Sequence, residues 1–91
     1  MKYSIVFTDS YTRRAEKFLR KHPELLKQYR KSFELLEFNP FHPSLRLHSL
    51  KGALDGLYSV SINMSYRITL EFLVSGSEIL PVDVGKHDEV Y

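Results

Sequence analysis

The chain has 91 residues, of which 43% are apolar, and it carries a formal net charge of +2 and no cysteine. This length predicts a single domain over residues 1–91, and the lack of cysteine excludes a disulfide framework and a thiolate-based site. Because no apolar run approaches the roughly 20 residues of a membrane-spanning helix and the N-terminus lacks a signal-peptide pattern, we expect a cytoplasmic protein with no membrane partner.

The small net charge conceals an uneven distribution along the chain. Residues 1–31 contain nine Lys and Arg against three Asp and Glu, whereas residues 32–91 contain four against eight. A basic N-terminal part indicates either a surface for a polyanion or an ordinary solvated helix face. The clustering of the positive charge favours a surface for nucleic acid.

The N-terminal part of the chain predicts a strand followed by a helix. Residues 2–7 alternate in polarity, as a half-buried strand does. Thr8, Asp9 and Ser10 then offer side-chain caps for a helix that runs to about Lys21. Its apolar face follows helical spacing and consists of Tyr11, Ala15, Phe18, Leu19 and His22.

A second helix is expected to begin at Pro23, because proline suits a first helical position and disfavours helical geometry in the residue before it. Its apolar positions recur at steps of three and four residues, at Leu26, Tyr29, Phe33 and Leu36, and Asn39-Pro40 ends it. The two helices should form an antiparallel hairpin with apolar inner faces.

The second half of the chain predicts a run of strands. Residues 45–48 alternate, with Leu45 and Leu47 inward. Residues 56–72, GLYSVSINMSYRITLEF, predict two amphipathic strands joined by a turn. The turn at Met64-Ser65 lacks the Asn-Gly or Asp-Gly that a two-residue hairpin prefers, which leaves a longer loop open.

The last predicted strand follows a turn at residues 75–77 and places Leu80, Val82 and Val84 inward. Pro81 then has the outward parity, which indicates an edge position or a bulge. The order β-α-α-β-β-β-β predicts an α+β fold, with the N-terminal strand and helix hairpin packed on one face of a small, mainly antiparallel sheet. The other face should be open and carry the function.

Strand parity brings four cationic or titratable side chains to that open face, namely Arg46, His48, Arg67 and His87. Imidazole and guanidinium groups suit phosphodiester cleavage, because histidine can transfer protons and arginine can stabilise the charge on the phosphate. The histidines show no metal-ligand spacing, so we expect no metal and no other cofactor.

Each of these side chains also has a non-catalytic interpretation. Arg67 could pair with Glu71 or Asp83 across the sheet. His48 could simply be exposed on its strand, and His87 could be idle near the end of the chain. The pattern alone leaves both interpretations open.

The sequence resembles the RelE/ParE superfamily of bacterial type II toxins over nearly its whole length. The segment LHSLKGALDGLYSVSINMSYRITLEF contains LKG, then G-x-[aromatic]-S-x-x-x-N, then YRI, in the order typical of that superfamily. The end of the chain, DVGKHDEVY, is similar to the tail of the RelE/YafQ-like branch. The resemblance implies a RelE-like fold.

The resemblance also implies a function and its partners. It implies a toxin that inhibits translation as a ribosome-dependent mRNA endoribonuclease, with the ribosome and mRNA as partners. The 2′ hydroxyl of the RNA would attack the adjacent phosphate without a metal. A cognate antitoxin would neutralise the toxin, and operator DNA would be bound only through the antitoxin complex.

By resemblance, roles fall on individual residues of this sequence. Arg67 of the YRI motif would bind and stabilise the phosphate, and His87 of the tail would be the general acid. Tyr91 would contact a base or transfer a proton, and His48 would be a candidate base. The positive charge for RNA binding would come from Arg46, Lys51, Arg13, Arg14 and Lys17.

The sequence also departs from the YafQ-like pattern. Ser61 and Ser65 stand where that pattern has a histidine and an aspartate, so the central hairpin carries no proton-transfer group of its own. Two alternatives remain, a ParE-like inhibitor of DNA gyrase and a degenerate domain that only binds antitoxin and operator DNA. His87 and Tyr91 favour the ribonuclease, because the ParE branch generally lacks such a tail.

Overall fold

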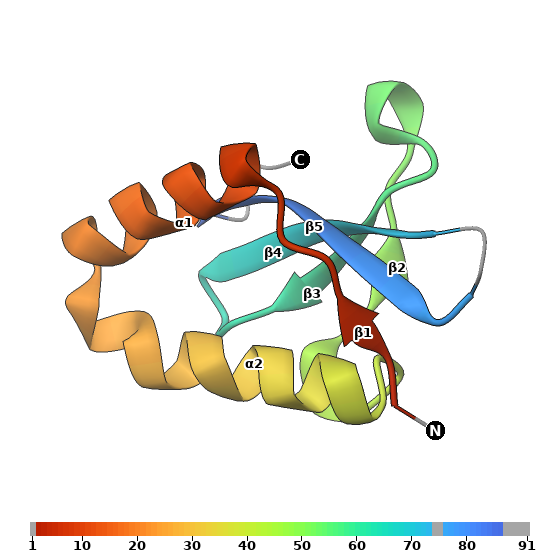
Figure 1. Ribbon diagram of the computed structural model, residues 1–91, viewed down its shortest axis with the longest axis horizontal. Helices are drawn as coiled ribbons and strands as arrows, with labels where there is room; N and C mark the ends of the chain where they lie inside the picture. Colours follow the sequence, from red (N-terminus) through yellow and green to blue (C-terminus); the bar gives the residue numbers. More distant parts are fainter. Residues whose placement is uncertain (1, 74–75, 87–91) are drawn as a thin grey trace.

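The computed structural model describes residues 2–73 and 76–86. Two helices and five strands follow the predicted order β-α-α-β-β-β-β (Figure 1). They are β1 (Ser4–Ile5), α1 (Asp9–Lys21), α2 (Leu26–Phe38), β2 (His48–Ser49), β3 (Tyr58–Ser61), β4 (Tyr66–Phe72) and β5 (Glu78–Lys86). The predicted α+β class is confirmed.

The five strands form one sheet in the order β1-β5-β4-β3-β2. Strand β1 is parallel to β5, and the other three pairs are antiparallel, which confirms the mainly antiparallel sheet. The first strand is shorter than residues 2–7, because only Ser4 and Ile5 pair with β5. Strand β4 is the middle strand of the sheet, and β5 and β3 flank it.

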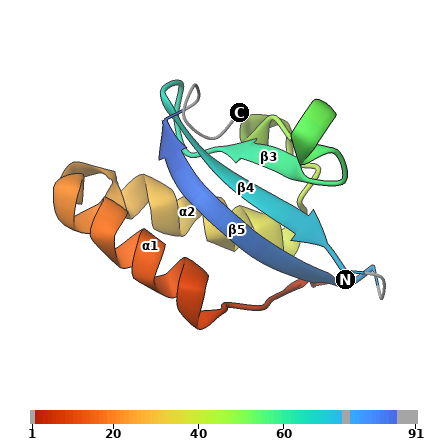
Figure 2. The same cartoon turned by 90° about the horizontal axis from the view of Figure 1, so that it is seen from above.

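Both helices lie against one face of the sheet, with α1 alongside β5 and α2 crossing behind β5 and β4 in the view of Figure 2. The apolar stripes of the helices meet the inward residues of the strands. Fully buried members of this core include Tyr11, Leu36, Val60, Ile68, Leu70 and Ile79. Burial of this apolar surface is the main force that holds the helix hairpin on the sheet.

A buried pair of tyrosines joins the two helices inside this core. The hydroxyl oxygens of Tyr11 on α1 and Tyr29 on α2 lie 2.7 Å apart and are hydrogen-bonded. Burial raises the pKa of Tyr11 far above the ordinary value of 10.0, and the neighbouring Tyr29 adds to this. Burial also raises the pKa of Tyr29. Both phenols are therefore neutral at physiological pH, as a buried hydrogen-bonded pair requires.

The helix boundaries follow local capping. Thr8 is the N-cap of α1, and its Oγ1 accepts a hydrogen bond from the Tyr11 amide at 3.1 Å. Pro23 starts a 3₁₀ turn over Pro23–Leu25, so α2 begins at Leu26 and the prediction of a helix from Pro23 is wrong by that turn.

The strand predicted at residues 45–48 is wrong in its first half. Pro43–Leu45 is a 3₁₀ turn, because Pro43 occupies its first position and Nδ1 of His42 accepts from the Ser44 amide at 3.2 Å. Arg46 follows in the left-handed region with φ of 51°. Leu45 is buried as expected, but from a turn, and only His48–Ser49 pairs as β2.

The parity predicted for the last strand is also wrong along part of its length. Thr69 is opposite Asp83, but Leu70 is opposite Pro81, so Val82 is an extra residue that forms a bulge. The bulge shifts the alternation by one, and Ile79 and Pro81 are buried in place of Leu80 and Val82. The proline had indicated a bulge, and the bulge is present, although β5 is a central strand.

The loop between β3 and β4 is longer than a tight turn. The Ile62 amide donates to the Tyr66 carbonyl at 2.9 Å, which leaves residues 62–65 between the strands. Oδ1 of Asn63 accepts from the amides of Ser65 and Tyr66 at 2.8 and 2.9 Å. The side chain of Asn63 therefore closes this loop, which lacks the Asn-Gly sequence of a two-residue turn.

Candidate functional site

The sheet face away from the helices carries a row of polar residues. His48, Ser59, Thr69 and Asp83 are successive register partners across β2, β3, β4 and β5. Ser59 and Thr69 are buried, so the middle of this face is less open than the sequence indicated.

Arg67 occupies the next row of the same face. It lies two residues before Thr69 on β4, and its register partners are Ser61 on β3 and Gly85 on β5. The side chain is half-buried, and its Nη1 donates to Oγ of Ser61 at 3.1 Å. This bond orients the guanidinium on the sheet face, where it can present N–H donors to an anion.

The structural alternative for Arg67 was a cross-strand ion pair. Between described residues, the ion pair observed is His22 with Glu24, and none joins Arg67 to Glu71 or Asp83. Ser61 contacts the arginine instead, as the acceptor for its Nη1.

His48 is exposed at the edge of the same face. Its Nδ1 lies 3.2 Å from the carbonyl oxygen of Arg46. Because a carbonyl oxygen can only accept, Nδ1 carries the proton and Nε2 is the basic nitrogen of the neutral ring. A proton on Nδ1 of His48 can therefore be donated to the Arg46 carbonyl.

The other predicted cations lie outside these two rows. Arg46 and Lys51 are exposed on the segment that surrounds β2. Arg13, Arg14 and Lys17 are exposed on α1, and Nη1 of Arg14 donates to the Val82 carbonyl at 3.1 Å. His87 and Tyr91, the predicted acid and its aromatic neighbour, lie outside the described residues.

Sequence reasoning missed a cavity of about 420 Å³ between α1 and the end of β5, which we call the flank cavity. Its lining consists of Arg14, Lys17, Phe18, Lys21, His22, Tyr66, Val84, Gly85 and Lys86. The sequence did contain a signal for this cavity, because the basic residues Arg14, Lys17 and Lys21 recur at the spacing of one helix face. A larger cavity of about 770 Å³ lies between α2 and the turn Pro43–Leu45 and has mixed charge, with Lys27, Lys31 and Glu34.

Among residues 2–73 and 76–86, no group of three or more His, Asp or Glu side chains is placed to hold a metal ion. None of the helices in that part of the chain is both long and apolar enough to cross a membrane.

Comparison with known proteins adds structural relatives but no sequence relatives. No protein-family model matches this sequence, and a search of curated proteins finds no significant relative. YafQ from E. coli, however, superposes with a TM-score of 0.77 at 12% identity, over 99% of both chains. The YoeB/ParE toxin from Agrobacterium tumefaciens superposes with a TM-score of 0.72 at 21% identity, over 92% of this chain and 98% of its own.

This chain has the RelE-like toxin fold. The E. coli DinJ–YafQ toxin–antitoxin complex contains a chain that matches it with a TM-score of 0.76 at 15% identity, over 100% of this chain and 99% of that one. Such low identities establish the fold, and the functional residues must be argued from this chain itself. The resemblance in sequence motifs and the likeness in structure agree on this fold.

The sequence did not single out Thr69, which lies in the polar row between Ser59 and Asp83. It is 3% exposed at the centre of the polar row, and its Oγ1 has no hydrogen-bond partner among the described residues. A buried hydroxyl without a partner costs about 1–3 kcal/mol of stability.

We expect the Thr69→Val variant to be more stable than the wild type by about 1 kcal/mol, because it replaces a partnerless hydroxyl with a methyl of similar shape. The free energy of unfolding, measured by urea denaturation, checks this. The control is Thr8→Val, which removes a hydroxyl that does cap α1 and should destabilise by about 1 kcal/mol. A destabilised Thr69→Val variant would contradict the assignment.

Proposed function

We propose that this chain is the toxin of a type II toxin–antitoxin system and acts as a ribosome-dependent mRNA endoribonuclease in the cytoplasm. The observation that carries the proposal is the position of Arg67 on the polar face of a RelE-like fold, half-buried and hydrogen-bonded to Ser61. The cleavage inhibits translation, and a cognate antitoxin prevents it.

The chemistry is an attack within the RNA chain. A base removes the proton of a 2′ hydroxyl, and the 2′ oxygen forms a bond to the adjacent phosphorus. The bond from phosphorus to the 5′ oxygen breaks, and an acid protonates that oxygen. The products are a 2′,3′-cyclic phosphate and a 5′ hydroxyl, and no metal takes part. We assign the base to His48, the acid to His87, and the contact near the leaving nucleotide to Tyr91.

The spacing on the sheet is suited to this division of roles. His48 and Arg67 are separated by two strand spacings and two residues along β4, which corresponds to about 12 Å between their Cα atoms. An arginine and a histidine extended towards each other can hold one phosphodiester across that distance. Arg67 then stabilises the charge that develops on the phosphate, and Nε2 of His48 accepts the proton of the 2′ hydroxyl.

The partners follow from the fold and from the charge. YafQ forms a complex with the antitoxin DinJ, and we infer that this chain binds a cognate antitoxin and reaches operator DNA only in that complex. For the ribosome and mRNA, the chain offers exposed cations on α1, at Arg13, Arg14 and Lys17, and near β2, at Arg46 and Lys51.

The proposal is tested by inducing the chain in bacteria and mapping the 5′ ends of cellular transcripts. We expect new ends within translated codons, and their loss in the His87→Ala variant, because the leaving oxygen would lack its proton donor. Intact transcripts with altered DNA supercoiling would assign the chain to gyrase inhibition instead. Normal growth and intact transcripts would leave a domain that only binds antitoxin and operator DNA.

A further inference from the structure

The flank cavity concentrates positive charge from two elements of the fold. Arg14, Lys17 and Lys21 come from one face of α1, and Lys86 comes from the end of β5. Within the described ranges 2–73 and 76–86, no Asp or Glu belongs to its lining. Helix α1 runs alongside β5 in Figure 2, and both elements contribute cationic residues to the lining of the cavity.

These four cations are not neutralised within the described part of the chain. The ion pair between described residues, with 3.6 Å between Nδ1 of His22 and Oε2 of Glu24, involves none of them. Nη1 of Arg14 donates a hydrogen bond to the Val82 carbonyl, and this bond links α1 to β5. Like charges gathered without a counter-charge repel one another, and a bound anion relieves that repulsion.

The wall of the cavity is aromatic. Phe18, His22 and Tyr66 are half-buried, and their ring centroids lie 4.8 to 5.4 Å apart. The hydroxyl of Tyr66 lies 3.5 Å from Nδ1 of His22. Such a wall offers ring faces directly beside the cationic groups.

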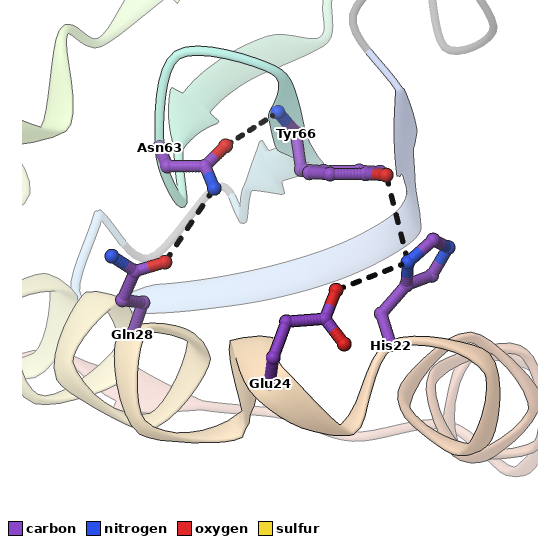
Figure 3. A network of polar contacts seen from close by, with 5 residues as sticks. All are labelled: His22, Glu24, Gln28, Asn63 and Tyr66. Atoms are coloured by element: carbon purple, nitrogen blue, oxygen red, sulfur yellow. Dashed lines mark hydrogen bonds and ion pairs between the residues drawn. The ribbon is translucent and has the colours of Figure 1, made fainter.

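Polar contacts fix Tyr66 in this wall, as Figure 3 shows. Oδ1 of Asn63 accepts from the Tyr66 amide at 2.9 Å, and Nδ2 of Asn63 donates to Oε1 of Gln28 on α2 at 3.5 Å. Asn63 thereby links the β3–β4 loop to α2. The aromatic wall is therefore built before any ligand arrives.

We propose that the flank cavity binds a phosphate of single-stranded RNA, with the attached ribose or base against the aromatic wall. Cations beside ring faces are the combination that holds single-stranded nucleic acid. The volume of about 420 Å³ is in the range of small-ligand sites. An acidic peptide would use the charge but would leave the rings without a role.

The flank cavity and Arg67 are separate contacts. Tyr66 and Arg67 are neighbours on β4, so their side chains point to opposite faces of the sheet. An RNA strand that reaches both must pass around the end of β4 and β5. The inference rests on the proposed function for its choice of RNA, but it concerns binding and does not require cleavage.

The test measures binding of a short unstructured RNA to the full chain by fluorescence anisotropy over a range of salt concentrations. The cavity variant is Lys17→Gln, Lys21→Gln and Lys86→Gln. The matched control, with the same change of net charge outside the cavity, is Arg20→Gln, Lys27→Gln and Arg30→Gln. All six side chains are exposed, so both variants should fold normally, which thermal unfolding verifies.

We expect the cavity variant to bind RNA at least about tenfold more weakly, and the slope of log K against log salt to fall by about 0.7, because one neutralised phosphate contributes about 0.7 for a single strand. The control should retain most of the affinity. Equal losses in both variants, or no loss in the cavity variant, would overturn the proposal.

Two further probes identify the source of the anion. Adenosine monophosphate tests a free nucleotide: saturable binding as tight as that of RNA would mean that the cavity accepts a nucleotide and not a strand, which overturns the proposal. Polyglutamate tests an acidic peptide: loss of its binding in the cavity variant, with RNA binding intact, would also overturn it. We expect neither.

Cleavage is measured separately on the same preparations. A chain that cuts transcripts but binds RNA equally well without the cavity lysines would contradict this inference alone. A chain that binds RNA through the cavity and cuts nothing would contradict the proposed ribonuclease alone.

Discussion

Replacing Arg67 with alanine is expected to reduce RNA cleavage by about 10²–10³-fold, because one preoriented donor to a developing negative charge typically contributes that much. The readouts are the 5′ ends of transcripts after induction and the growth of the induced cells. The fold should survive, since the Arg67 side chain is half-buried and lies on the face away from the helix-packed core.

Three further variants separate charge from geometry at this position. Arg67→Lys keeps the charge but loses the planar fork, so we expect it to recover only part of the activity. Ser61→Ala removes the oxygen that accepts from Nη1 and should cause a smaller loss than Arg67→Ala. Arg30→Ala, on the exposed surface of α2, should leave cleavage unchanged. Full activity in Arg67→Ala would refute the role of the arginine.

Replacing Leu36 with alanine is expected to lower the free energy of unfolding by about 2–5 kcal/mol, because Leu36 is 0% exposed and a buried cavity would remain. Domains of this kind are stable by only about 5–15 kcal/mol, so the loss is a large share. For a domain of this size each kcal/mol corresponds to a fall of about 4–8 °C in the unfolding temperature.

Leu26 supplies the matched control for this change. Leu26→Ala makes the same replacement on the same helix, but Leu26 is 38% exposed and at the start of α2. We expect the loss of stability there to be less than about half of that at Leu36, because solvent can fill the space. Equal effects in urea denaturation would mean that α2 does not pack on the sheet through Leu36.

The periodicity of particular segments determined much of this fold in advance. The helical spacing from Tyr11 to His22 predicted the buried face of α1, because amphipathicity is a local property, and the structure selected Thr8 from the three candidate caps that the sequence offered. The alternation in residues 58–61 and 66–72 predicted β3, β4 and the face of Arg67. The order of elements then sufficed for the α+β class.

Other features depend on residues that are distant in the sequence, and the local pattern of polar and apolar residues could not predict them. The extra residue Val82 becomes a bulge only in register with Thr69 and Leu70, and it reverses the parity of Leu80 and Pro81. Arg46 turns left-handed because Pro43 starts a capped 3₁₀ turn, so the alternation of residues 45–48 indicated a strand that is not there.

The same division applies to the sites. The sequence by itself determined that Arg67 and the serines share one sheet face, because alternation along a strand needs no knowledge of its neighbours. Only the tertiary structure decided that Ser61 holds Arg67 and that Thr69 is buried without a partner. It alone brought Lys86 to the basic stripe of α1, because a cavity is formed by elements that meet in space and not along the chain.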